Sequence, residues 1–246
     1  MGNKLKVILK KHSGRDSSGT ISVRHQGGRQ KRYFRMIDFK RDKKDVVGEV
    51  IAIEKDPNRN SLIALVKYAD GENRYILQAV GMKVGSKVIS SDNAEVKVGN
   101  AMMLKNIPLA EVVHNVELYP GRGGQIARGA GTLATVVAKE DHYVHLKLQS
   151  GEVRKFFENC FATIGRVGNI EHKDEVVGSA GRNILRGIRP TVRGTAQNPK
   201  THPHGGGEGR SGEGMHPKTP WGKSARGTRT RKPEKWSKKF IVKRRK

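Results

Sequence analysis

The sequence predicts an all-β protein in which two small antiparallel barrels lie between two extended basic segments. Residues 47–177 carry 16 basic and 16 acidic side chains, whereas residues 1–46 carry a net charge of +10 and residues 178–246 a net charge of +16. Runs of β-branched residues recur in the neutral part every 8–12 residues or so, with turn residues between them. Residues 178–246 hold 12 of the 30 glycines and 6 of the 9 prolines, with few large apolar side chains. Such a segment buries too little surface to order by itself.

Five or six strands are expected in the first barrel. Residues 46–54 and 62–68 are rich in β-branched side chains. Asp70 and Gly71 form a favourable hairpin turn into a third strand at residues 74–78. Residues 87–90 and 95–98 indicate a further, shorter pair.

Four or five strands are expected in the second barrel, after a boundary near residues 102–108. These strands are predicted at residues 113–118, 133–139, 143–148, 153–157 and 160–164. Each half has about 60–75 residues, the size of a small barrel, and the OB fold is one such barrel that commonly binds oligonucleotides. The predicted organisation is a basic N-terminal extension at 1–31, an OB-like barrel at 32–105, an SH3-like barrel at 106–177 and a Gly/Arg/Lys-rich C-terminal extension at 178–246.

The composition favours a polyanionic partner. The formal net charge is +26, and a polyanion would relieve the self-repulsion and release condensed counterions. Nucleic acid, an anionic membrane and an acidic protein would all fit, and nucleic acid is favoured. Cys160 is the one cysteine, which excludes an intrachain disulfide and a zinc site with two thiolates. No run of about 18 apolar residues is present, so no membrane span is expected.

Two Gly/Arg segments are candidate phosphate-binding elements. Residues 25–35 form a basic loop that enters aromatic residues, followed by Lys40 and Arg41. This loop fits a phosphate-contacting strand or an ordinary solvated edge strand. Residues 121–131 form a second loop, whose successive backbone N–H groups can cradle an anion. It lacks the Gly-Lys-Ser/Thr ending of a P-loop, and the alternative is a flexible linker.

Residues 202–210, with the sequence HPHGGGEGR, are the sharpest local feature. A metal site there would use His202, His204, Glu208 and His216. That spacing is not the spacing of a helical zinc motif, and no thiolate assists. Acid–base catalysis by His202 or His204 lacks a paired Ser or Cys nucleophile. We favour an RNA-binding loop, in which the glycines permit close approach and the imidazoles and Arg210 donate to phosphate or ribose oxygens.

Arginines recur every three or four residues between Arg182 and Arg193, and residues 182–189 fit a short basic helix before Pro190. Further along, Trp221, Trp236 and Phe240 interleave with Lys and Arg. This pattern is typical of a segment that orders on RNA by stacking on bases. The alternatives are a solvated helix face and a disordered tail.

Several motifs resemble one known family. RPTVRGTAQNP at residues 189–199, HPHGGGEGR at 202–210 and HPKTPWG at 216–222 resemble the C-terminal signature of universal large-subunit ribosomal protein two. The body motifs DPNR, RYIL, NIP, VHNVE and YPG, which lie between residues 56 and 121, are similar to the same family. The resemblance covers residues 19–246 and fits the bacterial or organellar branch best.

The resemblance implies a structural constituent of the large ribosomal subunit that binds 23S-type rRNA and is not an enzyme. It implies support for subunit association, tRNA binding and the peptidyl transferase centre. Its implied partners are large-subunit rRNA, other ribosomal proteins and the small subunit, with no membrane, in a bacterial cytoplasmic ribosome or an organellar one. No cofactor is expected, although Mg²⁺ can bridge carbonyls and RNA phosphates. The alternative is a free RNA-binding regulator or RNA chaperone.

The sequence departs from the bacterial pattern at Thr201, where the family usually has Asp before the histidine. The absence of an Asp–His pair argues against catalysis by His202. No catalytic or metal-ligating residue is therefore predicted. The predicted RNA-binding residues are Arg24, His25, Arg29, Lys31, Arg32, Arg35, Lys40, Arg41, Arg122, Arg128, Arg182, Arg186, Arg189, Arg193, His202, His204, Arg210, His216, Trp221, Lys223, Arg226, Arg229, Arg231, Lys243, Arg244 and Arg245.

Overall fold

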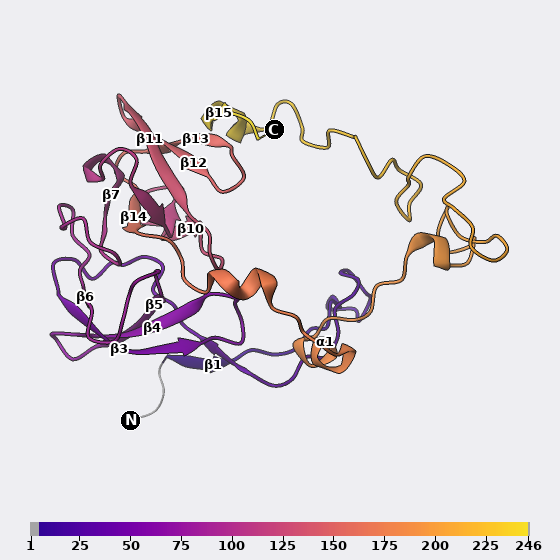
Figure 1. The fold of residues 1–246 in the computed structure, drawn as a ribbon, viewed down its shortest axis with the longest axis horizontal. Coiled ribbons are helices and arrows are strands. Elements are labelled where there is room, and N and C mark those ends of the chain that lie inside the picture. Colours follow the sequence, from indigo (N-terminus) through magenta and orange to yellow (C-terminus); the bar gives the residue numbers. More distant parts are fainter. Residues whose placement is uncertain (1–4, 246) are drawn as a thin grey trace. The chain divides into compact units, whose positions relative to one another are not determined.

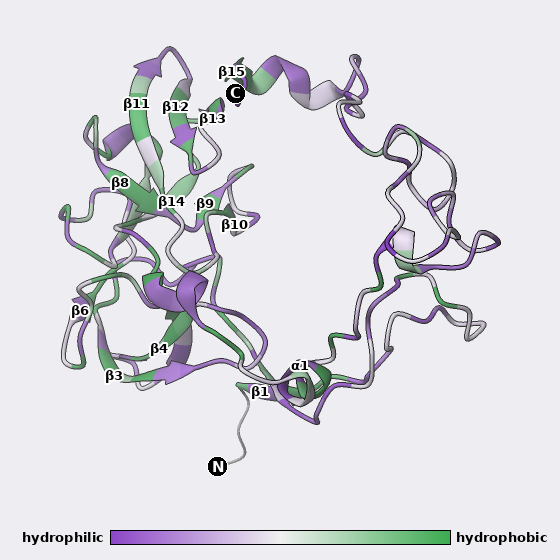
Figure 2. Ribbon diagram, turned by 45° about the vertical axis from the view of Figure 1, so that its right-hand side comes forward, coloured by the Kyte–Doolittle hydropathy of each residue, from purple (hydrophilic) through white to green (hydrophobic). Residues whose placement is uncertain are grey.

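The computed structural model describes residues 5–245, which form two compact units (Figure 1). The barrel unit comprises Met1–Leu9, Lys31–Val176 and Trp236–Lys246, and the loop unit comprises Lys10–Gln30 and Val177–Lys235. Figure 2 shows hydrophobic residues concentrated on the strands of the barrel unit, whereas the loop unit is mostly hydrophilic. None of the helices among the described residues is long and apolar enough to cross a membrane.

The first barrel is built on a four-stranded antiparallel sheet with the order β5-β4-β3-β6. Its strands are β3 (Gly48–Lys55), β4 (Leu62–Tyr68), β5 (Asn73–Leu77) and β6 (Lys87–Val88). Gly71 has a φ of +85° in the predicted turn between β4 and β5. Val50, Val66 and Ile76 lie in the core of this barrel and are at most 1% exposed. The β-branched side chains that favour strands thus also form the packing layer.

The second barrel contains a seven-stranded sheet with the order β15-β13-β12-β11-β8-β14-β7. Its strands are β7 (Ala101–Met103), β8 (Val112–His114), β11 (Ala134–Glu140), β12 (Tyr143–Leu148), β13 (Val153–Phe157), β14 (Phe161–Ile164) and β15 (Ile241–Lys243). A separate pair, β9 (Val116–Glu117) with β10 (Gly124–Ile126), completes it. Met102, Leu146 and Phe156 fill its core. The predicted fold class, all-β with an OB-like barrel followed by an SH3-like barrel, is confirmed.

Small elements complete the barrel unit. The strands β1 (Lys6–Ile8) and β2 (Tyr33–Arg35) form a two-stranded antiparallel sheet. The 3₁₀ helices are η1 (Leu104–Asn106), η2 (Ile170–Asp174) and η4 (Trp236–Phe240). Main-chain hydrogen bonds between residues 78–80 and 166–168 connect the two barrels, among them Gly168 N–H to the Gln78 carbonyl at 2.9 Å.

The loop unit has little regular structure and no apolar core. It contains α1 (Ala180–Arg186) and the 3₁₀ helix η3 (Gly194–Ala196). The N-terminal loop pairs with the chain after α1, because Gly27 N–H donates to the Gly187 carbonyl at 2.9 Å and Arg189 N–H donates to the His25 carbonyl at 3.0 Å. All the buried apolar side chains described lie in the barrel unit. Hydrogen bonds, rather than burial of apolar area, therefore hold the loop unit together.

Three expectations about the fold are corrected. Residues 95–98 form turns rather than a strand, since Lys97 N–H bonds the Glu95 carbonyl and Gly99 adopts a φ of +92°. The predicted strand at 113–118 is interrupted at Asn115, whose φ is +50°, so it forms two strands. Strand β7 precedes residue 106 but pairs with β14, in the sheet of the second barrel.

The C-terminal extension does not continue as a tail to its end. At Trp236 the chain enters η4 of the barrel unit, and β15 then pairs with β13. Phe240 is 8% exposed, with its ring centroid 5.8 Å from that of Phe157. The prediction that Phe240 stacks on RNA is wrong, because its ring packs within the second barrel.

Candidate nucleic-acid interface

The junction of the two barrels brings two arginines onto one aromatic ring. The Arg59 guanidinium carbon lies 5.6 Å from the ring centroid of Phe39, and that of Arg128 lies 4.5 Å from the same centroid. Arg59 comes from the loop between β3 and β4, and Arg128 from the loop between β10 and β11. The segment between β2 and β3 supplies Phe39. Cations within about 6 Å of a ring are attracted by its quadrupole.

Asp56 balances part of this charge. Its side chain is fully buried and lies 2.6 Å from Arg59 Nε and 3.7 Å from Arg35 Nη1. Burial opposes ionisation, but hydrogen bonds from Arg59 and Asn58 outweigh it and hold the pKa of Asp56 below its ordinary value. The carboxylate is therefore charged at neutral pH and orients Arg59.

Arg128 has no such compensation, since no carboxylate among residues 5–245 lies within ion-pair distance of it. Desolvation, and then the repulsion of Arg59, lower the pKa of Arg128, although the residue as a whole is exposed to solvent. Both effects penalise the positive charge, and the attraction of a phosphate at the junction would offset that penalty. A planar guanidinium with several N–H donors suits such an oxyanion.

Arg59 was not among the predicted RNA-binding residues. It follows Asp56, whose carboxylate accepts the Asn58 N–H at 3.0 Å in an Asx turn. An arginine directly after an Asx turn between two strong strands is the sequence signal that could have identified it. Its convergence with Arg128, 69 positions later in the chain, is a tertiary property.

The Gly/Arg loop at residues 121–131 does contain convergent backbone N–H groups, but a side chain of the protein occupies them. Glu117 is 2% exposed, and its carboxylate accepts hydrogen bonds from Gly123 N–H at 2.7 Å and Gly121 N–H at 3.3 Å. Phe161 N–H is a third donor at 3.0 Å. These N–H groups of the loop are therefore engaged by a carboxylate of the protein itself. Arg122 on the same loop is exposed, with its guanidinium 5.0 Å from the Tyr119 ring centroid.

Several predicted RNA-binding cations near the N-terminus have contacts within the protein. Arg41 is 3% exposed, and its guanidinium donates to the Gly99 carbonyl, so it is engaged within the protein. Arg35 pairs with Glu54 and Asp56. Arg32 Nη1 donates to the Pro57 carbonyl at 2.6 Å. Arg29 is half-buried, whereas Lys31 and Lys40 are exposed.

The loop unit holds the largest set of exposed predicted residues. It carries 18 Lys and Arg against 4 Asp and Glu, more than half of the net charge of the chain. The exposed ones are Arg24, His25, Arg182, Arg186, Arg189, Arg193, Arg210, His216, Trp221, Lys223, Arg226, Arg229 and Arg231. Arg24 lies over the Trp221 ring at 5.1 Å, which joins the N-terminal and C-terminal parts of the unit. Lys243, Arg244 and Arg245 are exposed in the barrel unit.

The two histidines of the glycine loop are buried rather than displayed. The rings of His202 and His204 stack with their centroids 5.1 Å apart. His202 is 8% exposed and His204 is 7% exposed. His204 Nε2 accepts the Lys218 N–H at 2.8 Å, and His204 Nδ1 lies 3.1 Å from the Glu213 carbonyl. Both nitrogens of His204 are thus engaged by main chain, a role that the sequence did not indicate.

His202 has a related role in the fold of this loop. Its Nδ1 accepts the His204 N–H at 3.1 Å. A side chain at Gly194 would meet the His202 ring, since a Cβ there would lie 2.4 Å from Cε1. The glycines and the two imidazoles therefore fold the loop against itself. No group of three or more metal-ligating side chains occurs among residues 5–245.

A two-barrel β fold, an arginine pair of which Arg128 has no carboxylate partner among the described residues, and a cationic unit without an apolar core together define a nucleic-acid-binding structural protein. Comparison with protein families makes this specific. The family model "Ribosomal Proteins L2, RNA binding N-terminal domain" matches residues 2–90, and "Ribosomal Proteins L2, C-terminal domain" matches residues 97–222. The chain belongs to the ribosomal protein L2 family, as the sequence motifs predicted.

Membership of this family makes the chain an RNA-binding structural constituent of the large ribosomal subunit. Its partners are rRNA and ribosomal proteins, and its location is the ribosome. The alternative of a free regulator or RNA chaperone is not favoured. The match divides the chain between residues 90 and 97, close to the turns at residues 91–100 that precede β7.

Proposed function

We propose that the chain holds 23S-type rRNA at two places, the Arg59–Arg128 junction and the cationic loop unit. The observation that carries this proposal is the arginine pair on Phe39, because the charge of Arg128 has no carboxylate partner among the described residues. The junction would bind backbone phosphates, and such contacts position an RNA without reading its sequence.

The loop unit would order fully on RNA and thereby support the peptidyl transferase centre, tRNA binding and association with the small subunit. Its excess of cations and its lack of buried apolar side chains support this role. Segments of this kind gain their ordering energy from the partner. We propose the ribosome of a bacterium or an organelle as the location, on the resemblance of residues 189–222 to that branch.

We also propose that the chain acts by holding RNA and not by chemistry of its own. The engagement of His204 by main chain and the presence of Thr201 before His202 support this. Mg²⁺ that bridges main-chain carbonyls and RNA phosphates would add to the binding without any protein side chain as ligand.

The experiment that tests the junction is filter binding of purified large-subunit rRNA to the full chain over a series of salt concentrations. The variant is Arg59→Gln with Arg128→Gln, and the matched control is Lys67→Gln with Lys147→Gln, two exposed cations on strands β4 and β12. Loss of each phosphate contact should reduce the slope of log K against log salt by roughly 0.7–0.9. An unchanged slope and affinity in the arginine variant would refute the junction as an RNA site.

A further inference from the structure

We infer that Phe39 is a positioning residue, which both barrels hold in place and which determines where Arg59 and Arg128 lie. This inference rests on the proposed binding of RNA by the two arginines. Phe39 needs no contact with RNA for this role. Its main chain is hydrogen-bonded to both barrels, and its ring contacts the guanidinium groups of Arg59 and Arg128.

The first barrel fixes the residue before the ring. Asp38 N–H donates to the Tyr75 carbonyl at 2.8 Å. The Asp38 carboxylate accepts the Arg41 N–H at 2.7 Å, and its other oxygen accepts Arg74 Nη1 at 3.1 Å. Side chain and main chain of Asp38 are thus both bonded to neighbours, which leaves Phe39 little freedom at its N-terminal side.

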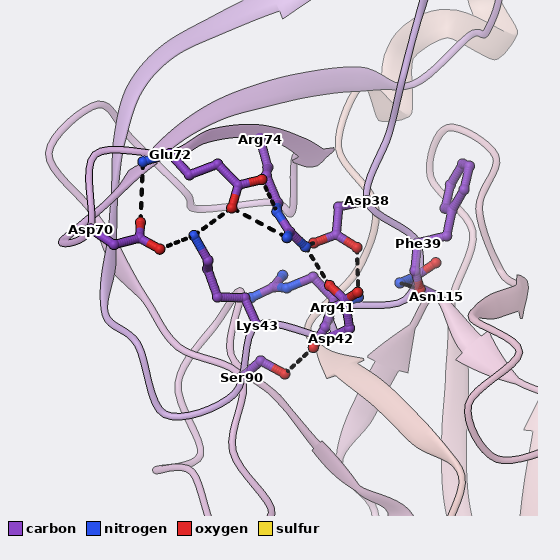
Figure 3. A network of polar contacts seen from close by, with 10 residues as sticks. All are labelled: Asp38, Phe39, Arg41, Asp42, Lys43, Asp70, Glu72, Arg74, Ser90 and Asn115. Atoms are coloured by element: carbon purple, nitrogen blue, oxygen red, sulfur yellow. Dashed lines mark hydrogen bonds and ion pairs between the residues drawn. The ribbon is translucent and has the colours of Figure 1, made fainter. Parts of the chain in front are cut away.

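Arg74 is the centre of a network that spans the segment before β3 and the β4–β5 hairpin (Figure 3). It bonds Asp38, Asp42 and Glu72, with Arg74 Nε 2.9 Å from Glu72 Oε1. Its hydrogen bond with Glu72, opposed by burial, is the first of the causes that raise the pKa of Arg74. Lys43 connects the same Glu72 to Asp70. Each partly exposed ion pair contributes little to stability. The main effect of the network is therefore to fix the positions of the side chains that it joins.

The second barrel fixes the carbonyl of Phe39. This oxygen accepts Gly124 N–H at 2.8 Å and Asn115 Nδ2 at 3.2 Å. Figure 3 shows Asn115 beside Phe39. The side chain of the preceding residue, Asp38, points toward Arg74. A Cβ at Gly124 would lie 2.1 Å from Asn115 Oδ1, so only glycine permits this approach. The Phe39 peptide therefore connects strand β10 and Asn115 of the second barrel with the segment that Arg74 holds.

The ring then decides the separation of the two cations. Both guanidinium carbons are within about 6 Å of one centroid, the range of cation–π attraction. They are accordingly no more than roughly 10 Å apart, although like charges repel. Asp56 holds Arg59, so without the ring that repulsion would move Arg128 away from Arg59. Both charges would remain, but the two guanidinium groups would no longer be held at a fixed separation that matches a short stretch of RNA phosphates.

The test is a double-substitution cycle on the full chain, with purified large-subunit rRNA as the probe and filter binding as the readout. Phe39→Leu removes the ring and keeps an apolar side chain, and Phe39→Tyr keeps the ring. Each is placed in the wild-type background and in the Arg59→Gln, Arg128→Gln background. Phe161→Leu is the matched control, because Phe161 also carries a cation, Lys44 at 4.9 Å, away from the arginine pair.

We expect Phe39→Leu to weaken binding roughly tenfold in the wild-type background, the equivalent of one or two cation–π contacts. It should have no effect in the background that lacks the arginines. Phe39→Tyr and Phe161→Leu should bind like the wild type. An equal loss in both backgrounds would overturn the inference, because the ring would then act independently of the arginines.

The two proposals fail in different ways. If the Arg59→Gln, Arg128→Gln protein binds like the wild type, the junction is not an RNA site and the proposed function fails. If that protein binds weakly while Phe39→Leu binds normally, only the positioning role fails. Thermal unfolding monitors the fold of every variant. Should Phe39→Leu not fold, Arg74→Lys replaces it, and unchanged RNA binding by Arg74→Lys then overturns the inference.

Discussion

The guanidinium of Arg41 lies on the carbonyl oxygen of Gly99, with Nη1 at 3.3 Å and Nη2 at 3.2 Å. The carbonyl of Arg41 in turn accepts the Ser90 hydroxyl at 2.7 Å. A residue that precedes β3 is thus bonded to the chain on both sides of the turns that lead into β7. Arg41 joins the first barrel to the start of the second.

Substitution of Arg41 should therefore affect stability rather than RNA binding. Arg41→Met removes the donors to Gly99 and should lower the free energy of unfolding by about 1–3 kcal/mol. Urea unfolding measures the loss, and Lys40→Met, at an exposed neighbour, is the control. A variant with normal stability but a smaller salt slope of RNA binding would show that Arg41 contacts RNA after all.

His114 should make stability depend on pH. Its Nδ1 donates to the Gly165 carbonyl at 2.9 Å. Complete burial, with a smaller contribution from Arg41, lowers the pKa of His114 from 6.5 to about 4. The unfolded chain therefore binds a proton at a higher pH than the native protein, and the free energy of unfolding falls as pH falls from 6.5 to about 4.

The contribution of His114 is complete above pH 7, and its loss has an upper limit of about 1.4 kcal/mol per pH unit. Urea unfolding at pH 7 and pH 5 measures this slope in the wild type and in His114→Asn. The variant should be less stable at pH 7 but lose less on acidification. An identical pH slope in the two proteins would contradict the assignment.

Cys160 should be unreactive in the native protein. Burial, together with the negative charge of Glu117, raises the pKa of its thiol to about 12, so hardly any thiolate exists at neutral pH. A chromogenic disulfide reagent should consume one thiol per chain in denaturant and almost none without it. Rapid stoichiometric reaction of the native protein would show that the core of the second barrel opens easily.

The aromatic cluster at the C-terminal segment should contribute to the stability of the second barrel. Phe240 lies 5.8 Å from Phe157 and 6.1 Å from Trp236, centroid to centroid. Phe240→Ala should cost about 2–4 kcal/mol, since it removes a buried ring at the edge of the sheet. Thermal unfolding measures this cost, and Trp221→Phe, at a residue 75% exposed, serves as the control.

Fluorescence provides a second readout for this cluster. Trp221 and Trp236 are the two tryptophans of the chain, so Trp221→Phe leaves Trp236 as the sole reporter. Trp236 stacks on Tyr119 with ring centroids 6.4 Å apart. A Phe240→Ala substitution in that background should shift its emission to longer wavelength. Emission typical of a fully solvated indole before the substitution would contradict the docked conformation.

The fold was largely predictable because local patterns coincide with the sheet. The strands at residues 62–68 and 143–148 have the predicted bounds, since β-branched runs end at turn residues there. A strand was also predicted at residues 95–98, which have similar side chains. Gly99 follows with a positive φ, and the segment forms a turn instead. The pairing of β15 with β13 joins residues almost 90 positions apart, which no local pattern encodes.

The candidate site was predictable only in its electrostatics. Net charge separated the cationic loop unit from the neutral body, but it could not separate buried arginines from exposed ones. Arg41 and Arg128 both lie in or beside basic or Gly/Arg segments. Arg41 is nevertheless buried, whereas Arg128 lies with Arg59 on the Phe39 ring. His204 was expected to face RNA because a glycine loop surrounds it, whereas its partners at Glu213 and Lys218 lie 9 and 14 positions later.

The position of β15 in the chain also bears on biosynthesis. It follows all other described strands in sequence, and it lies at the edge of the seven-stranded sheet, on β13. While the polypeptide is still being translated, β13 has already been made and has an open edge with unpaired N–H and C=O groups. Open edges of this kind promote aggregation. The edge of β13 thus stays open between synthesis of β13 and arrival of β15, and an RNA chain or a chaperone that covers it would protect the nascent protein during that interval.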